Sequence, residues 1–212
     1  MTDRILEPVE RLSEILFGLI MALTITCAVS VATADRVQIN HMVIAALGCN
    51  FAWGIIDAGM YLMATLGERG HNFLMAKGIR EARDPKSAHR IIANGLPAVL
   101  ASVFGPAHLE LIREKINQMS PSERPKLTGR DFVGASGICI LVILSTFPVV
   151  LPFAVFEDAR LALRVSNAIA IILLFVCGFL FARYAGLRPW TTGLIMVAVG
   201  VAQVSLAIAL GG

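Results

Sequence analysis

The chain has 212 residues, 57% of them hydrophobic, and a formal net charge of only +3. Soluble domains are typically about 45–50% apolar even when glycine is counted, so this composition indicates an integral membrane protein. The small net charge argues against nucleic acid as a partner. The cysteines stand singly in apolar stretches, which indicates neither a zinc site nor a disulfide framework, and we interpret them as small packing residues. They are Cys27, Cys49, Cys139 and Cys177.

The chain begins with a predicted surface helix and two apolar segments. Residues 2–12 place apolar and charged side chains on opposite faces of a helix, which is typical of a helix lying on a membrane. Crossing the hydrocarbon takes roughly 20 apolar residues. Residues 12–34 and 42–66 meet that length and are expected to cross the membrane, with residues 35–40 as the link between them.

Residues 67–128 differ from the rest of the chain. They carry charges throughout and no apolar run long enough to cross a membrane. Prolines suit the first turn of a helix, where their missing N–H costs nothing, and they help to place the predicted helices of this segment. These helices cover 68–83, 87–94, 97–104 and 106–119.

The remaining chain predicts three further spans, at 132–156, at 161–184 and from Pro189 to the last residues. Thr128 and Asp131 are three residues apart and resemble a capping box that opens the first of them.

That span contains Pro148 and Pro152. Prolines are tolerated in membrane helices where hydroxyls or neighbouring helices satisfy the carbonyls that they leave free, and Ser145 and Thr146 are the nearest candidates.

The predicted fold is an all-α integral membrane protein with five transmembrane helices and a cytosolic helical insert between the second and the third. Fifteen of the eighteen lysines and arginines fall on one side of this arrangement. Because basic residues favour the cytoplasmic side, the N-terminus and the insert are expected there and the C-terminus outside. The expected parts are a surface helix at 1–12, spans at 13–66, the insert at 67–128 and spans at 129–212.

Asp57 is the one carboxylate well inside a predicted span. A charge at membrane depth costs about 2.5–3.5 kcal/mol even on insertion-based scales, so it normally faces a bundle interior, a water-filled cavity or a bound cation. We interpret Asp57 either as an ion or proton site or as a protonated side chain that hydrogen-bonds to a neighbouring helix. It belongs to a polar stripe whose members recur at intervals of three or four residues, namely Asn50, Gly54, Asp57 and Tyr61.

The first predicted span carries a matching stripe, with Glu14 near its cytoplasmic end. Gly18 and Ala22 are small residues four apart, a spacing that lets helix backbones approach closely. Counted from the cytoplasmic edge, Met21 and Asp57 lie at the same depth, roughly 12 Å at 1.5 Å per residue. Thioethers bind soft transition metals and carboxylates bind harder ions, so Met21, Asp57 and Met60 are candidate ligands. Plain packing is the alternative for both methionines.

Two pairs of candidate metal ligands lie in the predicted insert, and each pair shares one helix face. Such pairs bind divalent metals in other proteins. Basic residues beside them favour the alternative, a solvated helix face. The pairs are Glu68 with His71 and Glu110 with Glu114, which His89 and His108 could join.

At two places the sequence resembles the vacuolar iron transporter family. Residues 13–23 read SEILFGLIMAL, which is similar to the family's R-E-x-I-F-G-x-x-D-G-L, with Met21 at the position of its aspartate. Residues 59–62 read GMYL, which is similar to the family's G-E-Y-L, with Met60 at the position of its glutamate. The order of two spans, an insert and three spans is also similar along nearly the whole chain.

The resemblance implies a homodimer in a bacterial inner membrane, with the ion path between the first helices of the two subunits and therefore near Gly18 and Ala22. It implies export of Fe²⁺ or Mn²⁺ from the cytoplasm in exchange for protons, with metal collected by glutamates of the insert. The two polar stripes add Asn50 and Glu14 to the expected ion path beside Asp57. The metal is then substrate, and no permanently bound cofactor is expected.

Two functions follow from these residues. The first is a secondary transporter of divalent transition-metal cations. The second is a scaffold or accessory subunit of the same fold that binds another membrane complex, because basic residues near a membrane attract anionic lipids and acidic partners. No catalytic triad, phosphate loop or haem motif is present, so an enzyme is not expected.

Overall fold

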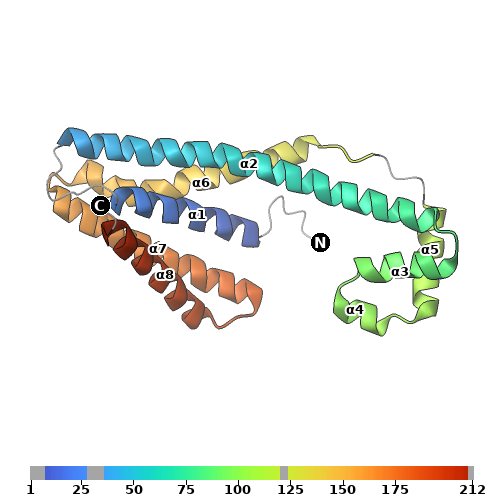
Figure 1. Cartoon of the computed structure of the whole chain (residues 1–212). Helices are drawn as coiled ribbons and strands as arrows, with labels where there is room; N and C mark the ends of the chain where they lie inside the picture. The colour runs from blue at the N-terminus through green and yellow to red at the C-terminus, as the bar shows by residue number, and fades with distance from the viewer. Residues whose placement is uncertain (1–7, 28–35, 120–123, 210–212) are drawn as a thin grey trace. The chain divides into compact units, whose positions relative to one another are not determined.

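The computed structural model describes residues 8–27, 36–119 and 124–209. Helices contain 89% of these residues, and no strand forms among them. The helices are α1 (Pro8–Cys27), α2 (Arg36–Arg80), α3 (Pro85–Gly95), α4 (Ala98–Val103), α5 (Pro106–Gln118), α6 (Gly129–Val155), α7 (Ala159–Ala185) and α8 (Pro189–Ala209) (Figure 1).

The chain divides into two compact units. Unit 1 takes the residues up to Tyr61 and from Arg130 onward, and unit 2 takes Leu62–Gly129. The helix α2 contributes its first part to unit 1 and its remainder to unit 2.

Within the described residues, four helices are long and apolar enough to cross a membrane, so the all-helical membrane fold is confirmed at this level. The first predicted span, 12–34, extends beyond the described residues, and its described apolar part is the shorter helix Leu12–Thr26. The predicted surface helix at 2–12 lies mostly outside the described residues. The four long segments are Val37–Arg80, Gly129–Val155, Ala159–Ala185 and Pro189–Leu206.

The helix α2 runs without a break through two predicted boundaries. The expected link at 35–40 is wrong from Arg36 onward, and the helix expected to begin at 68 is a continuation of the second span. No proline interrupts the sequence between Arg36 and Arg80, so nothing removes a backbone hydrogen bond there. The change from apolar to charged residues near 67 therefore does not mark the end of a helix.

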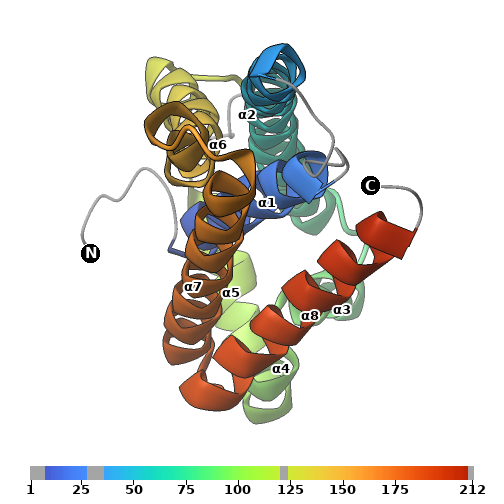
Figure 2. The ribbon, with the colours of Figure 1, turned by 90° about the vertical axis from the view of Figure 1, so that its left-hand side faces the viewer.

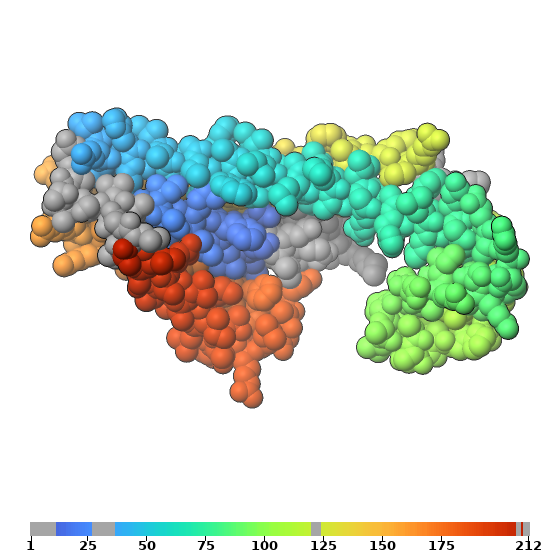
Figure 3. Space-filling model, in the orientation of Figure 1, coloured from blue at the N-terminus to red at the C-terminus, as the bar shows by residue number. Residues whose placement is uncertain are grey.

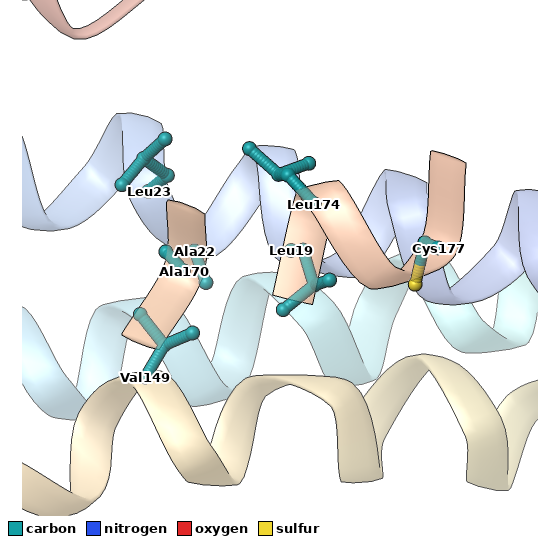
Figure 4. Close-up of a cluster of buried hydrophobic side chains, with 7 residues drawn as sticks. All are labelled: Leu19, Ala22, Leu23, Val149, Ala170, Leu174 and Cys177. Carbon is teal, nitrogen blue, oxygen red and sulfur yellow. The ribbon is translucent and has the colours of Figure 1, made fainter. Parts of the chain in front are cut away.

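The core of unit 1 joins α1, α6 and α7. Figure 4 shows Ala22 of α1 next to Ala170 of α7. Because both side chains are small, the backbones of the two helices come close. The helices α7 and α8 pack along each other (Figure 2) after a turn at Gly186, whose φ of 70° suits a residue without a side chain. The buried core side chains are Leu19, Ala22, Leu23, Val149, Ala170, Leu174 and Cys177.

Hydrogen bonds between side chains and backbone also join the helices of unit 1. Asn50 Nδ2 donates to the Gly18 carbonyl of α1 at 3.1 Å and to the Thr146 hydroxyl of α6. Ser166 of α7 donates to the Val149 carbonyl of α6 at 2.6 Å. Because an unpaired polar group is costly in an apolar interior, these bonds favour one arrangement of the helices.

The helix α6 continues through Pro148 and Pro152. Each proline leaves a carbonyl four residues earlier without its usual donor. The hydroxyls of Ser145 and Thr146 donate instead to the Val142 carbonyl, at 2.7 and 3.4 Å. The expectation that these two hydroxyls satisfy the freed carbonyls is therefore wrong, because their side chains turn back toward an earlier position.

Unit 2 has a small core of its own between the end of α2 and the helices α3 and α5. Ile79, Ala88 and Ile92 are buried in it. Arg80 Nη2 donates to the Ile116 carbonyl at 3.0 Å, which attaches the end of α2 to α5. The helices found at Pro85–Gly95, Ala98–Val103 and Pro106–Gln118 lie within two residues of the predicted bounds.

Gly18 provides a test of this packing. A Cβ added there would lie 3.0 Å from the Val142 carbonyl oxygen and would overlap the Ser145 hydroxyl. We expect Gly18→Ala to lower the free energy of unfolding by about 1–3 kcal/mol, as overpacked cores do. Gly59→Ala is the matched control, because a Cβ on Gly59 meets nothing within 4 Å. Thermal unfolding in detergent measures both, and equal stability of the two variants would contradict the close approach of α1 and α6.

Candidate functional site

A cavity of about 490 Å³ lies in unit 1 beside α1 and α2. These two helices are neighbours on the face of unit 1 that Figure 3 shows, in dark blue and in light blue to cyan. Two methionines, a cysteine and one carboxylate line the cavity among aromatic and aliphatic side chains. The lining residues are Phe17, Gly18, Ile20, Met21, Thr24, Ile25, Cys49, Trp53, Asp57, Met60 and Val142.

The structure brings together three residues that the sequence singled out. Met21 of α1 and Asp57 and Met60 of α2 all line this one cavity. Met21 and Asp57, which helix counting placed at the same predicted depth, therefore border the same space. The Cys49 thiol also lies there, and its Sγ is 3.2 Å from Met21 Sδ.

Helix periodicity explains which side chains reach the cavity. Cys49, Trp53 and Met60 follow one another at four and seven residues and so form a stripe along α2. Asp57 lies at the border between this stripe and the polar stripe described above. The sequence analysis predicted that Cys49 is a packing residue. Its spacing from Trp53 and Met60, however, puts all three on the face of α2 that lines the cavity.

The polar stripe itself serves mainly to pack α2 against α6. Asn50 is fully buried and bonds to α1 and α6, and it does not line the cavity. Gly54 lies against Cys139, where an added Cβ would be 3.0 Å from a backbone oxygen. Tyr61 lies against Gly134. Of the four residues in the stripe, only Asp57 lines the cavity.

Three residues of α1 were expected at the ion path or the dimer interface, and only one of them lines the cavity. They are Gly18, Ala22 and Glu14. Gly18 is buried and lines the cavity, while Ala22 is fully buried in the core between α1 and α7. Both residues contact helices of the same chain, and Ala22 leaves no surface for a second copy. Glu14 is partly buried and is not among the residues that line the cavity.

The cavity offers a mixed set of ligand atoms. Asp57 supplies a carboxylate, Met21 and Met60 supply thioethers, and Cys49 supplies a thiol. Sulfur ligands select softer transition metals, while an oxygen-only set suits Mg²⁺ or Ca²⁺. One carboxylate among sulfur atoms and aromatic rings therefore suits a transition-metal cation better than a hard one.

The candidate ligands of unit 2 do not gather into one cluster. Glu68, His71 and Glu114 are exposed. Glu110 instead pairs with His89 Nε2 at 2.7 Å and with Arg113 Nη2 at 2.5 Å. Over the part of the chain that the structure describes, no three histidine, cysteine or acidic side chains come together as a metal site.

Comparison of the sequence with protein-family models and with curated proteins finds no match.

The Glu110 pair provides a pH-dependent test of unit 2. The hydrogen bond from Arg113, followed by that from His89, lowers the pKa of Glu110 from 4.5 to about 2. A carboxylate with a lowered folded-state pKa stabilises the fold above its unfolded pKa, and this contribution is lost as the pH falls. We therefore expect Glu110→Gln to destabilise the contact of α3 with α5 at neutral pH, by an amount that shrinks from pH 4.5 toward pH 2.

Hydrogen exchange of the α3 and α5 amides in the full chain measures this dependence. Glu114→Gln is the control, because Glu114 is exposed on the same helix. Equal effects of the two substitutions at every pH would contradict a structural role for the Glu110 pair.

Proposed function

We propose that the chain is a membrane transporter of divalent transition-metal cations such as Fe²⁺ or Mn²⁺, working as a proton-coupled exporter. The observation that carries the proposal is the cavity in which Asp57, Met21 and Met60 meet. An intramembrane carboxylate is expensive unless it serves a function, and soft ligands around it suit a transition metal.

In this proposal the Asp57 carboxylate binds either a proton or the metal cation. Because the two compete for the same oxygens, metal and proton movements are coupled through one group. The thioethers of Met21 and Met60 and the Cys49 sulfur complete the ligand set. Glu14 stands nearer the cytoplasmic end of α1 and attracts cations toward the site.

We also propose a topology with five membrane spans. The helix α1 belongs to the cytoplasmic half of the first span, residues 67–128 form a cytosolic insert, and the C-terminus lies outside. The family that residues 13–23 and 59–62 resemble suggests a homodimer in a bacterial inner membrane. Phe17, Trp53 and Met60 are between 42% and 60% exposed around the cavity, which supports closure by a second copy.

The second candidate is a scaffold of the same fold that does not transport. The observation in its favour is the basic character of residues 67–131, which hold eleven of the eighteen lysines and arginines. Such a segment attracts anionic lipids or acidic partners. A scaffold tolerates the loss of Asp57, whereas a transporter does not.

Asp57→Asn distinguishes the two functions. Asparagine preserves the shape of the side chain but cannot ionise, so we expect expression and folding to persist while metal flux and coupled proton movement fall at least about 100-fold. That fall corresponds to about 2.7 kcal/mol. Flux into proteoliposomes of Fe²⁺, Mn²⁺, Co²⁺, Ni²⁺ and Zn²⁺ measures it. Glu157→Gln, an exposed carboxylate of unit 1, is the control.

Equal metal flux through the wild type and Asp57→Asn would refute this role. If the wild type moves none of the five ions and co-purifies with a stoichiometric membrane partner, the scaffold is the better explanation.

The topology has its own test. A reporter fused after Gly212 is expected to be active only outside the cytoplasm, because fifteen of the eighteen basic residues fall on the opposite side of a five-span chain. A cytoplasmic signal would remove one span from this arrangement or add one.

A further inference from the structure

Unit 2 contains a basic pocket of about 440 Å³, separate in sequence from the cavity of α1. Two segments form it: one face of α2, and the residues that lead into α6. Three of its described lining residues are cations and none is a carboxylate. The lining residues are Arg69, Asn72, Phe73, Arg124, Pro125, Lys126 and Thr128.

Local contacts hold the two segments together. Arg69 Nη1 donates to the Lys126 carbonyl at 2.6 Å. Next to it, Gly70 has no side chain, and a Cβ there would already lie 4.0 Å from Pro125 Cγ. Asn72 and Phe73 follow Arg69 at three and four residues, so all three point from the same face of α2.

The donors of the pocket match the oxygens of a phosphate group. Arginine has a planar guanidinium with five N–H donors, so Arg69 can bond the Lys126 carbonyl and an anion at once. Arg124 adds a second guanidinium, Lys126 an ammonium, and Asn72 an amide. The volume exceeds what a phosphate alone fills, which leaves room for the glycerol or ester part of a larger ligand.

The place of the pocket in the sequence indicates where such a phosphate comes from. Thr128 directly precedes Gly129, the first residue of a helix long and apolar enough to cross a membrane. Arg69 follows shortly after the apolar stretch of α2 that ends near Leu66. Both walls of the pocket thus adjoin apolar segments, and the phosphates found at the end of such segments are those of lipid headgroups.

We propose that this pocket binds the phosphate group of an anionic lipid. Arg69 and Arg124 contact the phosphate oxygens, Lys126 adds positive charge, and Phe73 covers the apolar side of the headgroup. The proposal is independent of metal transport, because none of these residues lines the cavity of α1 and α2.

Native mass spectrometry of the full chain in detergent tests the proposal, with phosphatidylglycerol, phosphatidylcholine and inorganic phosphate as probes. We expect the wild type to retain phosphatidylglycerol preferentially. The double variant Arg124→Gln/Lys126→Gln should weaken that binding about thirtyfold, from roughly fivefold for each charge removed. Arg90→Gln/Lys115→Gln is the matched control, since it removes two exposed charges of unit 2 outside the pocket. It should change binding less than twofold.

Elution of both double variants at the wild-type volume in size exclusion shows that they fold. Equal weakening by the two double variants would overturn the proposal, because the attraction would then be spread over the whole basic surface. Equal retention of phosphatidylglycerol and phosphatidylcholine would overturn it as well. Binding of inorganic phosphate that competes with phosphatidylglycerol at similar concentration would replace the lipid with a soluble phosphate compound.

Discussion

The arrangement of unit 1 depends on the side chain of Asn50. Its amide nitrogen donates to the Gly18 carbonyl of α1 and to the Thr146 hydroxyl of α6, so one residue of α2 joins three helices at one level. In an apolar interior no water replaces such bonds, so losing one costs the full desolvation of the polar group. The contact requires a residue without a side chain at position 18, because a Cβ there would lie 3.0 Å from the Val142 carbonyl oxygen.

The cavity lies beside the bond from Asn50 to Gly18, because Gly18 is one of its lining residues. With α1 fixed against α2, Met21 stands beside Cys49, and Asp57 faces the same space. On the proposed resemblance to the vacuolar iron transporter family, Met21 and Met60 stand where an aspartate and a glutamate are expected. We propose that Asp57, one turn before Met60, restores a carboxylate to the site, and that the methionines shift its preference toward softer metals.

Apolar length and helical spacing predicted the long helices and the meeting of Met21 with Asp57. They could not predict the continuous α2, because a change of polarity looks the same whether the helix ends or continues. Spacing also could not tell whether a small residue packs against a second copy of the chain or against another helix of the same chain. Ala22 belongs to a face that fits a second copy or another helix of the same chain, and the structure packs it against α7. Glu110 looked like a ligand, but it is engaged by Arg113 one turn along α5 and by His89 of α3. The pairing with His89 joins two helices, and such a pairing is not visible in one sequence.

We propose that the cavity of α1 and α2 binds the transported cation through sulfur and one carboxylate. X-ray absorption at the iron edge, on the full chain loaded with one equivalent of Fe²⁺, tests it most directly. We expect sulfur as well as oxygen neighbours around the iron. The sulfur signal should be lost in Met21→Leu/Cys49→Ser/Met60→Leu and kept in Met63→Leu, which alters an exposed methionine outside the cavity. A shell of oxygen and nitrogen alone, or a sulfur signal that survives the triple substitution, would contradict it.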